Sequence, residues 1–163
     1  CLMCMEIYLF YTMGFFMTFE NFVMWAEQKF GYRIPREYLS FLEKGDFDST
    51  VRKYYVIDEE NVLEISEWFT PDNIPEIYKN CCKEKMIEKY HLPILDSCGC
   101  IAVLNCDSGA DTYGQIWLRA PAGYYDEDLQ ENVYDEMEFA AENFMEILRN
   151  LKDAEQLEKM GIF

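Results

Sequence analysis

Apolar residues in the second half of the chain fall into runs with the spacing of β-strands. Residues 100–106 (CIAVLNC) form an apolar run with β-branched members, bounded by turn-forming residues, which is typical of a strand buried on both faces. Residues 92–96 form a second apolar run, separated from the first by the turn residues 97–99. Residues 114–119 alternate, with Trp117 on the more polar side. Because short connections usually join neighbouring strands, these three segments are predicted to be neighbours in one antiparallel sheet.

Apolar residues at helical spacing predict four helices around this sheet. The first covers residues 19–30, with Thr18 as its N-cap, and the second covers residues 35–45. A third is expected over residues 72–89, and a fourth over residues 135–151. The fourth helix should pack on the sheet through its apolar stripe, and two members of that stripe are predicted core residues, Phe144 and Leu148.

Two further strands are predicted at residues 53–57 and 62–65, so the chain mixes strands and helices without a repeating β-α-β order. The predicted fold class is therefore α+β: a single domain with a mainly antiparallel sheet and helices packed against it. Residues 17–152 are predicted to form the domain and residues 153–163 a helical tail.

Residues 1–16 are predicted to be an apolar extension before the domain, since they hold a single charge, Glu6. The segment is too short for a transmembrane helix and lacks the basic start and cleavage site of a signal peptide. An over-extended gene start or an added segment is one interpretation. The alternatives are an apolar arm that packs on the domain, or a contact that forms a homodimer.

Two motifs, in the same order along the chain, resemble the SUKH superfamily, which contains the Smi/Knr-type domain. The first is residues 34–45 (IPREYLSFLEKG), similar to an early helix of the family. The second is the Leu-Pro strand, glycine turn, apolar strand, glycine-led strand and closing helix within residues 92–151. Cys100 stands where the family usually has Asp, and Lys44 stands where it usually has Asn. Both departures fall at turns, and the resemblance covers about residues 19–151.

The resemblance implies an intracellular, cytoplasmic immunity protein that neutralises a cognate toxin by direct binding. One alternative is a non-toxin SUKH-type interaction module that serves as a scaffold or regulator. A less favoured alternative is an enzyme of unknown chemistry. A toxin-like open reading frame next to the gene would distinguish the first two.

The net charge narrows the class of partner. At −17, from 14 Lys and Arg against 31 Asp and Glu, the chain repels nucleic acids and anionic membranes. A basic partner, such as a basic toxin, is favoured, although excess acidity also serves solubility in many proteins.

The acidic residues concentrate after the third predicted strand, where no Lys or Arg occurs between Arg119 and Arg149. Two tyrosines directly precede three carboxylates there, in what the sequence predicts to be an exposed loop. Aromatic rings anchor interfaces and charges steer partners, so this segment and the polar side of the preceding strand are the predicted binding surface. The alternative is an ordinary solvated loop. The predicted partner-binding residues are Trp117, Tyr124, Tyr125, Asp126, Glu127, Asp128 and Glu131.

No pattern favours catalysis, a metal or a cofactor. The five cysteines between positions 81 and 106 form no Cys-x-x-Cys knuckle, which structural zinc prefers, and those at 100 and 106 fit the face of a buried strand. His91 is the only histidine, and a pair with Cys98 or Cys106 is conceivable, but no nucleophile signature surrounds either cysteine. The expectation is a non-enzyme without cofactor or bound metal.

Overall fold

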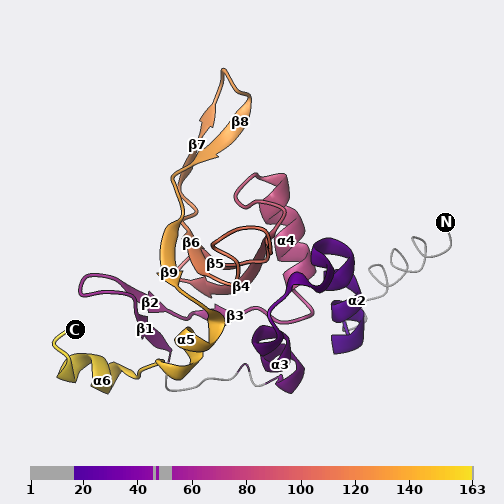
Figure 1. Cartoon of the computed structure of the whole chain (residues 1–163). Coiled ribbons are helices and arrows are strands. Elements are labelled where there is room, and N and C mark those ends of the chain that lie inside the picture. Colours follow the sequence, from indigo (N-terminus) through magenta and orange to yellow (C-terminus); the bar gives the residue numbers. More distant parts are fainter. Residues whose placement is uncertain (1–16, 46, 48–52, 163) are drawn as a thin grey trace.

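The computed structural model describes residues 17–45, 47 and 53–162, and Figure 1 shows the whole arrangement. The predicted extension at residues 1–16, with its homodimer alternative, lies outside the described residues. Helices α2 to α6 and an antiparallel sheet make up one α+β body, as the sequence predicts.

The centre of the molecule is a five-stranded antiparallel sheet in the order β3-β4-β5-β6-β9. The three strands predicted to be neighbours are neighbours: β4 pairs with β5, and β5 pairs with β6. Ala102, Val103 and Leu104 in β5 are fully buried, which confirms the prediction of a strand covered on both faces. The strands of this sheet are β3 (Glu67–Trp68), β4 (His91–Ser97), β5 (Cys100–Asn105), β6 (Ile116–Arg119) and β9 (Glu138–Ala141).

The first two helices begin and end where the sequence predicts. Thr18 caps α2 (Phe19–Phe30) by accepting a hydrogen bond from the backbone N–H of Asn21 at 3.2 Å. A short 3₁₀ turn, η1 (Gly31–Arg33), leads on to α3 (Arg36–Lys44). Gly45 ends α3 with φ of 65°, a left-handed conformation that glycine adopts without strain.

Helix α4 (Ile74–Lys83) is shorter than the predicted 72–89. The chain leaves the helix at Glu84, and Lys85 then has φ of 59°, which stops helical hydrogen bonding. Residues beyond this point form an irregular segment leading into β4, where Ile87 is buried. The apolar residues Met86 and Ile87 therefore pack against the core from a loop and not from a helix.

The predicted helix over residues 135–151 is wrong in its first half. Residues Glu138–Ala141 form strand β9, whose Ala141 and Phe139 pair with Ile116 and Trp117 of β6. The helix proper, α5 (Phe144–Arg149), starts only after Asn143, whose side chain accepts from the N–H of Glu146. Strand pairing at the open edge of β6 outweighs the weak helical preference of this alanine-containing stretch.

The aromatic part of the core joins α3, β3 and α5. Phe144 is 2% exposed, as predicted, and its ring centroid lies 4.9 Å from that of Tyr38 and 5.1 Å from that of Phe41. Trp68 packs on the same ring at 5.9 Å. Leu148, the other predicted core residue, is only half-buried and packs against the edge of the core.

A small sheet and a last helix complete the body. Strands β1 (Tyr54–Val56) and β2 (Val62–Glu64) pair with Tyr55 opposite Leu63. Helix α6 (Ala154–Lys159) begins with a capping box between Asp153 and Gln156. Within the part of the chain that the structure describes, no helix has the length and apolar character needed to cross a membrane.

Candidate functional site

The segment predicted to be an acidic loop is a β-hairpin that projects from the body, drawn in orange at the top of Figure 1. Strands β7 (Gly123–Asp126) and β8 (Glu131–Tyr134) pair only with each other, with Tyr124 opposite Val133. We call residues Gly123 to Tyr134 the arm. Gly123 makes the pairing possible, because a Cβ there would lie 2.7 Å from the carbonyl oxygen of Val133.

The tip of the arm is shaped by one of the predicted interface carboxylates. Asp126 Oδ1 accepts hydrogen bonds from the backbone N–H groups of Asp128 at 2.9 Å and Leu129 at 3.0 Å. Asp126 therefore holds the turn, whereas the side chains of Glu127 and Asp128 are exposed.

Large apolar side chains are also exposed on the arm. Tyr124 is 62% exposed, Tyr125 59% and Leu129 62%. Because successive strand residues point to opposite faces, the two tyrosines place a ring on each face of the arm. Exposed aromatic rings surrounded by exposed carboxylates are typical of a protein-binding surface, which has an aromatic centre and a polar rim.

The end of α4 supports the arm from the side. Lys85 Nζ forms an ion pair with Glu131, and Glu84 Oε2 accepts a hydrogen bond from Asn132 Nδ2 at 3.1 Å. Glu131, predicted to contact a partner, therefore already has a cation beside it. No sequence pattern indicates this pairing, because Lys85 lies far from Glu131 along the chain.

Arg119 fixes the base of the arm to the body. Its Nε donates to the carbonyl oxygen of Met86 at 2.6 Å, and its Nη1 donates to that of Asp135. The guanidinium also lies 5.8 Å from the ring centroid of Tyr134. Alternation along the strand puts Arg119 on the same side as Trp117, but no pattern in the sequence indicates this positioning role.

Trp117 is separate from the six other predicted interface residues. It lies on β6 in the main sheet, half-buried, with its ring 5.6 Å from that of Phe139 at an edge-to-face angle of 80°. The sequence predicts that this residue contacts a partner. Phe139 covers part of it, and the rest opens on a pocket at the base of the arm.

That pocket has a volume of about 280 Å³. His91 forms part of its lining and is 8% exposed, with Nδ1 accepting from the N–H of Glu88 at 3.3 Å. Burial, with a smaller contribution from the charge of Arg119, lowers the pKa of His91 to about 4. The imidazole is therefore neutral at pH 7. The pocket is lined by Tyr90, His91, Asn105, Asp107, Ala110, Thr112, Trp117 and Met137.

Neither Cys98 nor Cys106 lines the pocket together with His91. Cys106 is fully buried, which raises its pKa to about 12 and keeps the thiol protonated. Cys98 lies at the opposite end of β4 from His91, about 20 Å away at the usual rise per strand residue. Neither cysteine lines the pocket, so the structure does not assemble the Cys–His pair that the sequence left conceivable.

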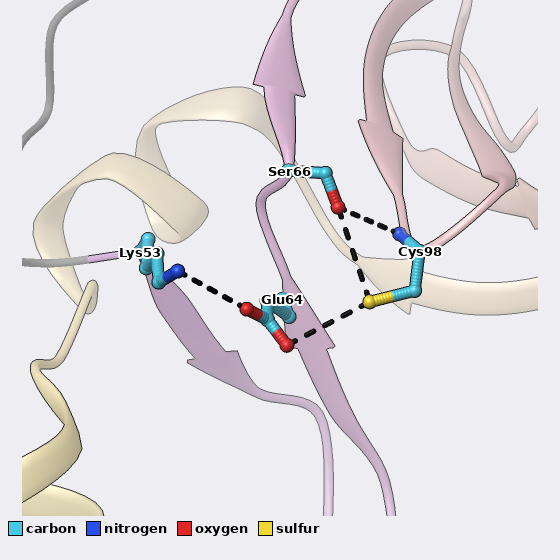
Figure 2. Close-up of polar contacts among 4 residues, drawn as sticks. All are labelled: Lys53, Glu64, Ser66 and Cys98. Atoms are coloured by element: carbon cyan, nitrogen blue, oxygen red, sulfur yellow. Dashed lines mark hydrogen bonds and ion pairs between the residues drawn. The ribbon is translucent and has the colours of Figure 1, made fainter.

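Cys98 is exposed in the β4–β5 turn, not packed like Cys106. Figure 2 shows its surroundings: the Cys98 N–H donates to Ser66 Oγ at 2.9 Å, and the thiol lies 3.6 Å from Glu64 Oε2. Glu64 in turn forms an ion pair with Lys53 at 3.2 Å. These contacts fasten the turn to β2. Across residues 17–45, 47 and 53–162, no three His, Cys, Asp or Glu side chains are grouped to hold a metal ion.

Comparison with protein families gives a match over most of the chain. Residues 20–150 match the SMI1 / KNR4 family (SUKH-1). This range includes the central sheet, the arm and the pocket, and it agrees with the resemblance found in the sequence. No curated protein matches the chain.

Proposed function

We propose that this chain, which belongs to the SMI1 / KNR4 family (SUKH-1), is an immunity protein that neutralises a basic toxin by binding it directly. SUKH domains are commonly immunity proteins to polymorphic toxins and are generally non-catalytic. A binding role therefore requires a surface that recognises a protein. The arm is the best candidate for that surface.

The observation that carries this proposal is the composition and position of the arm. It projects from the body, so a partner can contact both its faces (Figure 1). It exposes Tyr124, Tyr125 and Leu129 together with the carboxylates of Glu127 and Asp128. Desolvated aromatic rings supply most of the binding energy in protein interfaces, while rim charges govern the rate of association.

The charge of the whole chain supports a basic partner. At −17 the protein attracts a cationic protein over a distance set by the Debye length, about 8 Å at physiological salt. A nuclease-type toxin, which carries positive charge to bind nucleic acid, would be recognised through the same charges.

The test first identifies a toxin-like reading frame beside this gene, and then uses the protein that it encodes. Binding of the full chain is measured by surface plasmon resonance at low and physiological salt. Reversal of the two exposed tip charges, Glu127→Lys with Asp128→Lys, should slow association about tenfold or more at low salt and less at high salt. A matched control is Glu59→Lys with Glu60→Lys, two adjacent exposed carboxylates in the β1–β2 turn.

The aromatic part of the surface has a different kinetic signature. Tyr124→Ala and Tyr125→Ala should speed dissociation about tenfold or more each, with association nearly unchanged. Cells that express these variants should no longer be protected against the co-expressed toxin. The proposal fails if the chain does not bind the neighbouring protein. The assignment of the arm fails if the tip reversal and the control behave alike.

A further inference from the structure

The pocket at the base of the arm has the chemistry of a receptor for one cationic side chain. The residues that line it include two aromatic residues, Trp117 and Tyr90, and one acidic residue, Asp107. Burial raises the pKa of Tyr90, and the negative charges of Glu88 and Asp107 raise it further. Two carboxylates therefore act on the same aromatic wall. A cation placed there would face aromatic rings and negative charge together.

Neither of the two basic residues near the pocket, Arg119 and His91, brings a positive charge into its lining. Arg119 donates to the carbonyl oxygens of Met86 and Asp135 and does not line the pocket. His91, which does line it, is neutral at pH 7. The lining is thus neutral or negative.

Hydrogen bonds connect several of the residues that line the pocket. The amide of Asn105, 3% exposed, donates to Thr112 Oγ1 at 2.8 Å and accepts from the N–H of Asp107 at 2.8 Å. Asp107 Oδ1 accepts from the N–H of Gly109 at 3.0 Å, which fixes the loop that carries it. A wall already in its bound shape loses little entropy when a side chain enters.

The size of the pocket fits one long side chain. A cavity of about 150 Å³ is enough to hold benzene, and this pocket is about 280 Å³. Between the two long cationic side chains, arginine fits the lining better. Its planar guanidinium stacks on aromatic faces and pairs with a carboxylate through two parallel hydrogen bonds, whereas lysine presents a compact hydrated charge.

We infer that this pocket receives an arginine side chain of the protein partner, held between Trp117 and Tyr90 and paired with Asp107. The inference rests on the proposed function for the source of that arginine. Trp117 precedes the arm and Met137 follows it, so the pocket adjoins the arm at its base. A partner lying along the arm would meet both surfaces, with the arm steering approach and the pocket holding one residue.

The experiment titrates ¹⁵N-labelled full chain with Nα-acetyl-arginine methylamide and follows the indole N–H signal of Trp117 by NMR. The chain has three tryptophans, so Trp117→Phe assigns the signal. The uncharged analogue is Nα-acetyl-citrulline methylamide, which keeps the shape of arginine without its charge. Nα-acetyl-lysine methylamide tests the alternative cation.

The arginine probe should shift the Trp117 signal saturably and bind about tenfold more tightly than the lysine probe. The citrulline probe should not shift the signal. Asp107→Asn should weaken arginine binding about tenfold, since an asparagine oxygen can still accept from Gly109 and only the charge is lost. The matched control is Asp111→Asn, an exposed carboxylate in the same loop that does not line the pocket. Thermal melts verify that each variant is folded.

Three results would each overturn the inference: no saturable shift with the arginine probe, equal binding of citrulline, or full affinity in the Asp107→Asn variant. Tighter binding of lysine would refute the assignment of arginine. The probe contains no toxin, so the two proposals fail separately. A pocket that binds arginine in a chain that ignores the neighbouring protein refutes the proposed function alone.

Discussion

At the scale of single residues, Tyr38 has an unusual place in the core. Its side chain is fully buried against Phe144 and Phe41. Its hydroxyl has no hydrogen-bond partner among the described residues, and burial raises the pKa of that hydroxyl well above its ordinary value. The ring contributes packing, while the hydroxyl carries a desolvation cost of about 1–3 kcal/mol.

Tyr38→Phe should therefore leave the packing intact and raise the free energy of unfolding by about 1 kcal/mol. Urea denaturation followed by tryptophan fluorescence measures this change. Phe41→Tyr adds a hydroxyl to a neighbouring, less buried ring and serves as the control, with a smaller change or a loss. A Tyr38→Phe variant less stable than the parent chain would mean that the hydroxyl makes a stabilising bond.

His91 makes stability depend on pH with a defined sign. Its pKa is about 4 in the folded chain against an ordinary value of 6.5. The unfolded chain thus binds a proton between these values when the folded chain does not. The contribution of His91 is fully present above pH 6.5 and is lost as the pH falls from there toward 4.

Between pH 7 and pH 5 the parent chain should lose about 2 kcal/mol of stability through this residue. His91→Gln, which cannot take up a proton, should lack that part of the loss, while the carboxylates titrate alike in both proteins. Denaturation midpoints across pH 4.5–7.5 give the difference between the two chains. A constant difference over the whole range would contradict the assignment.

At the scale of elements, the sequence predicted what depends on local burial and capping. The buried run at residues 100–106 and the caps at Thr18 and Gly45 were predictable because each signal lies within a few residues. Strand β9 was not, because its Ala140 and Ala141 fit a helix equally well, and only pairing with β6 decides the conformation. The arm was mistaken for a loop for a different reason: its two four-residue strands have no buried residue, so they show no apolar face in the sequence.

The arm is a two-stranded sheet, which is marginally stable in isolation, so its order depends on its attachments. Arg119→Met should remove the hydrogen bonds to Met86 and Asp135 and loosen the arm. Amide hydrogen exchange should then quicken about tenfold or more over residues 123–134, and protection of β4 and β5 should stay near that of the parent. Arg149→Met, at an exposed position in α5, is the control. Uniformly faster exchange throughout the sheet would show that Arg119 supports the whole fold instead.

At the scale of the whole molecule, the candidate site was only partly predictable. Tyr124, Tyr125, Glu127 and Asp128 are contiguous in sequence, so composition alone brought them together as a predicted surface. The pocket draws on four separate segments, including Tyr90, Asp107 and Met137, and these meet only after the sheet has formed. Its partner-binding role and that of the arm remain predictions.

The chain carries −17 net charge, and the three ion pairs among its described residues all lie at exposed or half-exposed positions. Exposed pairs contribute little, so repulsion among carboxylates should dominate the electrostatic energy of the folded state.

Raising NaCl from about 20 mM to about 300 mM shortens the Debye length and should stabilise the chain by about 1 kcal/mol, or about 2–4 °C in melting temperature. Scanning calorimetry at fixed pH measures the shift. Glu59→Lys with Glu60→Lys moves the net charge toward zero at exposed positions, so this variant should show a smaller response to salt. A melting temperature that falls as NaCl rises would mean that the few ion pairs outweigh the repulsion among the carboxylates.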